Sequence, residues 1–205
     1  SLHTPLVKKG THPTLGLIGL EFLQSLSKRT VLLNTCRGGV VSEGDIRKFY
    51  QERNDLNFVF DVWENEPKVA RDVVNTTKIS TPHIAGYSME SKFAAVNSLR
   101  KSLAANFDLS IVNRKLIDID ASENHCEFKE GNSLKTILAQ EFSLQQISND
   151  FKCAVNDGQD LTYFDKVRKQ LISRREYRGA SMDDSTLGEF QKKILAQLEI
   201  LMSKS

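Results

Sequence analysis

Residues 30–62 read TVLLNTCRGGVVSEGDIRKFYQERNDLNFVFDV, and this stretch decides the fold. It opens with an apolar, β-branched run, residues 30–34, which is long enough for a buried parallel strand. The turn residues Gly38-Gly39 follow, and Ser42 can then cap a helix. A second apolar run, residues 57–62, provides the next strand. Because strand, helix and strand follow one another at this spacing, the stretch predicts a βαβ unit and a parallel sheet.

The same alternation continues to a third short strand at residues 78–80. Polar residues follow each predicted strand where it ends: Arg37 after the first, the acidic stretch 61–66 after the second and His83 after the third. Ligands of parallel α/β sheets bind at the carboxyl ends of the strands. The sequence therefore predicts a functional site along this edge of the sheet.

Arg37, Glu66 and His83 each have an ordinary explanation when taken alone. Arg37 can be a surface arginine at a turn, Glu66 a solvated loop residue, and His83 a structural histidine. Together they offer more: a histidine that exchanges a proton, a carboxylate that fixes its tautomer, and an arginine that binds a carboxylate substrate. This set suits hydride transfer to or from a 2-hydroxy acid, with a cofactor carrying the hydride.

The pattern changes after residue 88, and we place a domain boundary near residue 110. A long helix is expected over residues 88–107. The segments expected beyond it are short strands at 111–112, 116–119 and 126–128, helices at 134–140 and 144–154, and a basic helix from Phe164 to about 174–176. A last amphipathic helix should carry an apolar stripe of Leu187, Phe190, Ile194, Leu198 and Leu201.

Composition excludes several classes of partner. The 205 residues hold 28 Lys+Arg and 26 Asp+Glu, a net charge of +2, which gives no broad electrostatic basis for binding nucleic acid or an anionic membrane. No apolar run reaches about 18 residues, so no membrane-spanning helix is expected. Three widely spaced cysteines and four scattered histidines favour a reducing, cytoplasmic setting and no metal site.

The stretches around Arg37, Glu66 and His83 resemble those of the NAD-dependent D-2-hydroxyacid dehydrogenases. In that family an Arg-Gly pair, a Glu before Pro and a Pro-His pair follow successive strands and form the catalytic trio, which matches Arg37, Glu66 and His83 here. The resemblance is strong over residues 1–92 and weaker over 110–160. Its further carriers are His3-Thr4-Pro5-Leu6, Asn34 to Val41, Asp61 to Pro67, Thr81 to Lys92, and a tail containing Phe164 to Lys169 and Arg174-Arg175-Glu176-Tyr177.

The resemblance implies an α/β fold with two parts. Residues 1–87 would form the C-terminal half of a doubly wound, Rossmann-type nucleotide-binding domain, and residues 88–109 a connecting helix. Residues 110–205 would form a small α+β dimerisation domain. The implied protein is a homodimeric enzyme that oxidises a small phosphorylated 2-hydroxy acid with NAD.

The resemblance also assigns site residues by position. The implied cofactor contacts are Thr4, Thr35, Cys36, Arg37, Asp61 and Gly86. Tyr87 matches a substrate contact. A phosphorylated substrate needs a fork of donors, so one of the adjacent Arg174 and Arg175 is expected to bind it.

Some features depart from the family pattern. Ser42 stands where the family usually has Asp, and Ser91-Lys92 where it has Gly-Lys. The chain contains no GxGxxG motif, which the family carries upstream, so we expect the chain to be the C-terminal part of the enzyme. Two alternatives stay open: another dehydrogenase of the family, acting on glycerate or phosphoglycerate, and a non-catalytic dimerisation fragment. The choice between NAD and NADP is also open.

Overall fold

A computed structural model describes residues 4–107, 127–128, 138, 142–177, 181–183, 187–198 and 201–203. The chain divides into two compact units, and each is formed from two separate segments. Unit 1 comprises Ser1–Ala85 and Leu144–Lys169. Unit 2 comprises Gly86–Ser143 and Gln170–Ser205.

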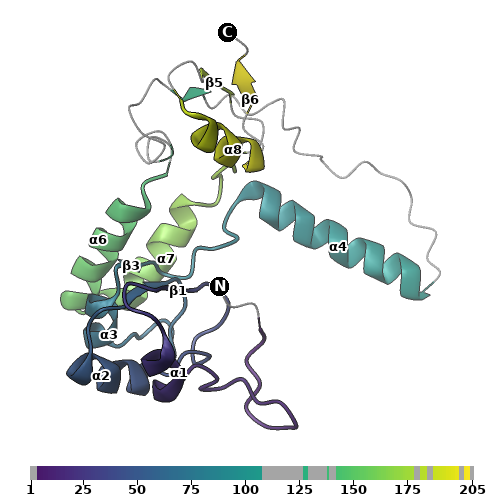
Figure 1. Cartoon of the computed structure of the whole chain (residues 1–205). Coiled ribbons are helices and arrows are strands. Elements are labelled where there is room, and N and C mark those ends of the chain that lie inside the picture. The colour runs from purple at the N-terminus through teal and green to yellow at the C-terminus, as the bar shows by residue number, and fades with distance from the viewer. Residues whose placement is uncertain are drawn as a thin grey trace. The chain divides into compact units, whose positions relative to one another are not determined.

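Unit 1 is built on a parallel sheet, which confirms the predicted α/β class. The strands pair in the order β1-β2-β3, with Leu32 opposite Phe58 and Phe60 opposite Ser80. Helices α2 and α3 connect them, and α1 packs beside α2 (Figure 1). The elements are α1 (Leu20–Ser25), β1 (Val31–Asn34), α2 (Glu43–Glu52), β2 (Asn57–Phe60), α3 (Arg71–Thr76) and β3 (Ile79–Ser80). The predicted Ser42 cap of α2 is confirmed, because its side chain accepts a hydrogen bond from Asp45 N.

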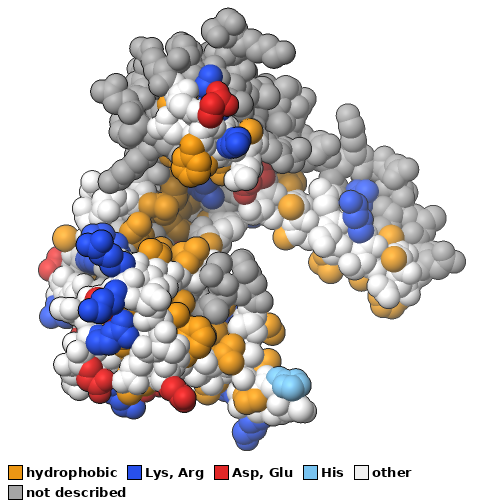
Figure 2. Space-filling view, in the orientation of Figure 1, with side chains coloured by type: hydrophobic (Ala, Val, Ile, Leu, Met, Phe, Trp, Pro, Cys, Tyr) orange, Lys and Arg blue, Asp and Glu red, His pale blue; other side chains and the backbone are white. Residues whose placement is uncertain are grey.

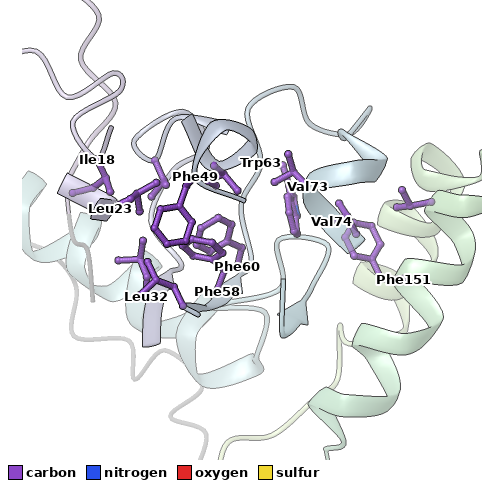
Figure 3. Packing of buried hydrophobic residues seen from close by; sticks show 14 of the residues in the cluster. Ile18, Leu23, Leu32, Phe49, Phe58, Phe60, Trp63, Val73, Val74 and Phe151 are labelled. Carbon is purple, nitrogen blue, oxygen red and sulfur yellow. The ribbon is translucent and has the colours of Figure 1, made fainter. Parts of the chain in front are cut away.

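Aromatic side chains fill the core of unit 1 (Figure 3). Phe49 of α2 packs edge-on against Phe58 of β2, with ring centroids 6.2 Å apart. The series continues through Phe60 and Trp63 to Phe151. Burying such side chains contributes roughly 1.5–3 kcal/mol each.

Phe151 belongs to α6 (Leu144–Asn156), which lies far along the chain from the sheet. Ser148 of this helix accepts a 2.9 Å hydrogen bond from Ser80 N, and Lys152 Nζ donates to Thr77 O at 2.6 Å. The following helix, α7 (Asp160–Gln170), adds Phe164, whose ring lies 5.4 Å from that of Phe151. These contacts make residues 144–169 part of unit 1.

The two compact units do not coincide with the expected ranges, which were residues 1–87, 88–109 and 110–205. Residues 144–169 pack with the strands of unit 1, because Phe151 and Phe164 complete its core. Sequence spacing alone does not reveal that the chain comes back to unit 1 at residues 144–169. The roles expected of the three ranges, nucleotide binding and dimerisation, stay predictions.

Unit 2 contains a long helix and a small sheet. Helix α4 (Met89–Phe107) buries none of its residues, and Val96, Leu99 and Phe107 are exposed. Figure 2 shows hydrophobic side chains along its surface. The sheet has three parallel strands in the order β4-β5-β6, and α8 packs against β6. These elements are β4 (Glu127–Phe128), β5 (Ser181–Asp183), α8 (Glu189–Gln197) and β6 (Leu201–Ser203).

Two predicted helices end earlier than expected. Helix α7 stops at Gln170, so Arg174 and Arg175 lie outside it. Helix α8 stops at Gln197, and Leu201 lies in β6 because residues 201–203 pair with β5. The expected segments 111–112, 116–119 and 134–140 lie outside the described residues, apart from residue 138.

The stripe expected on α8 is only partly buried. Leu187, before the helix, is buried, whereas Phe190 is exposed. Leu195, which the stripe did not include, is fully buried. No helix in the described ranges combines the length and apolar character needed to cross a membrane.

Candidate active site

The three predicted polar segments of unit 1 meet at one edge of the sheet. The parallel hydrogen bonding continues one residue beyond the strands, since Asp61 N donates to Asn34 O at 3.0 Å and Thr81 N to Phe60 O at 2.9 Å. The loops that leave β1, β2 and β3 therefore start side by side. This is the edge at which parallel α/β sheets bind ligands.

Gly38 brings the first two loops into direct contact. A Cβ atom at this position would lie 1.7 Å from the carbonyl oxygen of Trp63, so only glycine fits there. Trp63 is held in turn by its indole, whose Nε1 donates to Thr81 O at 3.0 Å. The Arg37-Gly38 pair is thus pressed against the loop that carries Glu66.

His83 and Glu66 form a hydrogen-bonded pair, as predicted. His83 Nδ1 lies 2.6 Å from Glu66 Oε2. The other oxygen, Glu66 Oε1, accepts a 2.8 Å hydrogen bond from Trp63 N. An ionised carboxylate only accepts hydrogen bonds, so the ring donates to it from Nδ1, and Nε2 is the ring nitrogen that does not face Glu66.

The backbone of His83 adopts a left-handed conformation, with φ of 54°. Outside glycine such values are uncommon, and they persist only where neighbouring contacts hold the chain. Asp61 supplies some of these contacts. Its Oδ1 accepts from Thr81 Oγ1 at 2.6 Å and from Ile84 N at 2.7 Å, and its Oδ2 accepts from Ala85 N at 2.8 Å.

Asp61, which is expected to contact the cofactor, also holds the 81–85 loop through hydrogen bonds. It is 4% exposed, and its oxygens accept the hydrogen bonds of the 81–85 loop. Burial raises the pKa of the Asp61 carboxyl above its ordinary value, while the hydrogen bonds from Thr81, Ile84 and Ala85 act in the opposite direction. Asp61 therefore anchors the loop that presents His83, and its cofactor contact stays a prediction.

Arg37 is exposed at the end of β1. Its guanidinium Nη1 donates to Cys36 O at 2.5 Å rather than to Glu66 or His83. The structure therefore brings together two of the three predicted catalytic side chains. Arg37 lies on the neighbouring loop with an exposed guanidinium, which suits an anion more than an internal partner.

The expected cofactor residues lie in different surroundings. Thr4 and Thr35 are half-buried, whereas Cys36 is buried and its amide and thiol both donate to Asn34 Oδ1. Gly86 has φ of 78°, and nothing lies within 4 Å of the place a Cβ would occupy. Its backbone is therefore open to a ligand.

The expected substrate residues Tyr87, Arg174 and Arg175 each have a partner within unit 2. Arg174 Nε donates to Tyr87 O at 3.0 Å, and its guanidinium lies over the ring of Phe142 at 4.8 Å. Lys92 Nζ lies 5.0 Å from the centre of the Tyr87 ring. Arg175 Nε donates to Glu90 Oε1 at 2.5 Å. In the described residues both arginines therefore serve the packing of unit 2, and their binding of a phosphate stays a prediction.

The start of α4 is hydrogen-bonded to the segment 174–176. Glu176 Oε1 accepts from Ser88 Oγ at 2.6 Å and from Ser91 Oγ at 2.7 Å. Burial opposes ionisation of Glu90, but hydrogen bonds from Arg175 and from Glu176 N outweigh it, so the pKa of Glu90 lies below its ordinary value. Ser91, a departure from the family pattern, thus has a partner here.

Sequence reasoning missed Arg168 of α7. Its Nε donates to His83 O at 3.3 Å, and its Nη2 lies 3.9 Å from Glu66 Oε2. In the sequence, the segment 164–169 that contains Arg168 indicates only a resemblance to the family. No local signal reveals the contact, because 85 positions separate Arg168 from His83.

The chain is similar in sequence to known dehydrogenases. Residues 1–85 match the family model described as D-isomer specific 2-hydroxyacid dehydrogenase, NAD binding domain. Erythronate-4-phosphate dehydrogenase of Acinetobacter baumannii strain AYE is 32% identical over 182 residues, which cover 86% of this chain and 50% of that protein. The enzyme of the same name from Shewanella baltica strain OS155 is 32% identical over 184 residues, 89% of this chain and 49% of the relative.

This chain therefore spans about half the length of the curated relatives it matches. Among solved structures, a glycerate dehydrogenase related protein from Thermoplasma acidophilum aligns with 40% of this chain and 28% of its own. The sequence identity is 32% and the TM-score is 0.35.

Proposed function

We propose that this chain is part of an NAD-dependent enzyme that oxidises a D-2-hydroxy acid. The proposal starts from the match of residues 1–85 to the family model of the D-isomer specific 2-hydroxyacid dehydrogenase NAD binding domain. The observation that carries the proposal is the 2.6 Å hydrogen bond between His83 Nδ1 and Glu66 Oε2. It lies at the edge of a parallel sheet where ligands bind.

The substrate proposed is 4-phospho-D-erythronate, oxidised at its 2-hydroxyl to the 2-oxo acid. The printed names of the A. baumannii and S. baltica relatives support this choice. A resemblance of the C-terminal tail, residues 164–177, points the same way. Such an activity would place the protein in the synthesis of pyridoxal phosphate.

The chain's own residues suit the proton side of this reaction. With Nδ1 donating to Glu66, Nε2 of His83 is the base that takes the proton from the substrate hydroxyl. Glu66 fixes the tautomer and stabilises the imidazolium that forms. Arg37 binds the substrate carboxylate through its exposed guanidinium and favours loss of hydride from the adjacent carbon.

NAD, when bound, supplies the hydride acceptor. The backbone at Gly86 fits a close approach by a flat ring, since no atom of the residues that the structure describes lies within 4 Å of the place of its missing Cβ. Thr35 and Arg37 at the end of β1 can offer a hydroxyl and a cation to the same ligand. Thr4, Cys36 and Asp61 complete the proposed cofactor set.

A substrate panel tests the proposal. The full-length protein that contains this chain would be assayed with NAD and 4-phospho-D-erythronate, D-glycerate or 3-phospho-D-glycerate. We expect kcat/KM to be highest for 4-phospho-D-erythronate. A preference for D-glycerate or 3-phospho-D-glycerate would assign the chain to another member of the family, and no activity with any of them would contradict the dehydrogenase assignment.

We also propose that the enzyme is a cytoplasmic homodimer. Exposed apolar side chains along α4, Val96, Leu99 and Phe107, support this because they gain from being covered by a second subunit. Light scattering of the full-length protein should give twice the monomer mass, and a monomer mass at micromolar concentration would contradict the proposal.

A further inference from the structure

Arg168 contacts both members of the His83–Glu66 pair from α7. The Nε atom donates to the carbonyl of His83 at 3.3 Å, and the Nη2 atom lies 3.9 Å from Glu66 Oε2. The guanidinium also lies over the ring of Phe164, 5.2 Å from its centre. The side chain is 29% exposed, so these contacts are partly shielded from water.

The contact with the carbonyl acts on the strained point of the loop. His83 carries the left-handed φ of 54°, and such a conformation needs restraint from outside the residue. Asp61 restrains the amides that follow, Ile84 N and Ala85 N. Arg168 restrains the carbonyl of His83 itself.

The contact with Glu66 acts on charge. Glu66 Oε2 faces both His83 Nδ1 and Arg168 Nη2, while Oε1 faces Trp63 N. The guanidinium attracts the same carboxylate oxygen that His83 Nδ1 contacts, so it helps to fix where that oxygen lies. A carboxylate held in this place accepts from Nδ1 and directs Nε2 away from Glu66.

We propose that Arg168 is a positioning residue for the His83–Glu66 pair. The inference rests on the proposed function of that pair. It extends the active unit to helix α7, which lies beyond the residues matched by the family model. Through the His83 carbonyl and the Glu66 carboxylate, Arg168 holds the imidazole in the tautomer and direction that a base requires.

Two replacements of Arg168 test the role, with a neighbour as control. Arg168→Gln removes the charge and the fork of donors, whereas Arg168→Lys keeps the charge. Lys169→Gln is the matched control, because Lys169 is 75% exposed and pairs with Asp165. All three would be made in the full-length protein, with thermal melting to verify folding.

We expect Arg168→Gln to lower kcat by about tenfold or more while KM changes less than about threefold, which marks a loss felt in the transition state. Arg168→Lys should recover part of kcat, and Lys169→Gln should leave both constants unchanged. A kcat within twofold of wild type in a folded Arg168→Gln protein would overturn the proposal.

A second measurement separates this inference from the proposed function. The ¹⁵N shifts of the neutral His83 ring report which nitrogen carries the proton, and they need no enzymatic activity. The wild type should show the Nδ1–H tautomer, and Arg168→Gln should show a mixture of the two. An unchanged tautomer with unchanged kinetics contradicts the positioning role, whereas a changed tautomer in a protein without dehydrogenase activity retains it and rejects the proposed reaction. If Arg168→Gln does not fold, Arg168→Lys decides, because lysine keeps the charge but loses the fork that contacts both His83 O and Glu66: a kcat clearly below that of the wild type with intact folding supports the role, and a kcat equal to that of the wild type refutes it.

Discussion

Gly38 shows how a single residue fixes the distance between two loops of the site. Its missing side chain leaves room for the Trp63 carbonyl, which would lie 1.7 Å from a Cβ. Replacing Gly38 by Ala must push the Arg37 loop away from the Glu66 loop. We expect Gly38→Ala to lower the free energy of unfolding by about 2 kcal/mol or more, as overpacking against backbone does, measured by urea denaturation.

Gly44 is the matched control in the same region. It lies in the first turn of α2, and the nearest atom to its added Cβ would be Ser42 Oγ at 3.8 Å. Alanine favours a helix over glycine by up to about 1 kcal/mol. Gly44→Ala should therefore be neutral or stabilising, and an equal loss of stability in both variants would contradict the steric account of Gly38.

The residues of the candidate site are predictable to the extent that their signal is local. Glu66 and His83 each follow a strand directly, and parallel strands bring their ends together, so their pairing could be predicted. Arg168 could not, because its contact depends on how α7 packs against the sheet. The expectation that Arg174 or Arg175 binds a phosphate rests on the family resemblance and on the fork of donors that a phosphate needs, and neither reveals that Tyr87 O and Glu90 are their partners.

At the scale of elements, the start of α2 is joined to the loop after β2 by two glutamates. Glu43 N donates to Glu64 Oε1 at 2.8 Å, and Glu64 N donates to Glu43 Oε1 at 2.9 Å. Glu43 is 4% exposed. Burial raises the pKa of its carboxyl above 4.5, and the nearby Glu64 carboxylate raises it further, although the hydrogen bond from Glu64 N opposes both.

This pair predicts a pH-dependent effect of Glu43→Gln. A raised pKa means that the folded protein prefers the protonated carboxyl, so the stabilisation is present below pH 4.5 and is lost as the pH rises through the folded pKa. The amide stays neutral throughout. We expect Glu43→Gln to raise the free energy of unfolding at pH 7 and to have little effect below about pH 4.

Asp72 provides a control of the opposite sign. Hydrogen bonding to Arg47 outweighs burial and lowers the pKa of Asp72. Its folded form is therefore stabilised above its unfolded pKa and loses that stabilisation as the pH falls. Asp72→Asn should destabilise at pH 7, only weakly because the pair is exposed to solvent. A pH-independent effect of Glu43→Gln in urea denaturation would contradict the account.

The sequence predicts best the elements whose ends are marked by neighbouring residues, such as turn residues or a helix cap. Strand β1 is an apolar run bounded by turn residues, and α2 begins at a serine cap, so both were identified correctly. Helix α8 was extended too far because Leu198 and Leu201 continue its apolar spacing. Pairing of residues 201–203 with β5 overrides that spacing, and no local pattern encodes a pairing between distant strands.

At the scale of the whole molecule, the chain contains the sheet edge that carries the proposed His83–Glu66 site but no phosphate-binding glycine motif. Its eleven glycines include no GxGxxG arrangement. In nucleotide-binding folds that motif places the pyrophosphate on a helix N-terminus. We therefore expect the 205-residue chain alone to show no NAD binding by isothermal titration calorimetry at millimolar cofactor, whereas the full-length protein binds.

Tight NAD binding by the 205-residue chain would show that another segment holds the pyrophosphate. Absence of binding to the full-length protein would favour the alternative that the chain is a non-catalytic dimerisation module. These two outcomes separate the enzyme from the module without a substrate.

If His83, held by Glu66, is the base of a D-2-hydroxyacid dehydrogenase as we propose, the enzyme should depend on its imidazole. In the full-length protein, His83→Gln should lower kcat with 4-phospho-D-erythronate by about 10²–10⁴-fold, the usual contribution of a general base. The affinity for NAD should be unchanged, and His12→Gln, at an exposed loop position, should leave kcat intact. A kcat of His83→Gln within a few-fold of wild type would contradict the assignment.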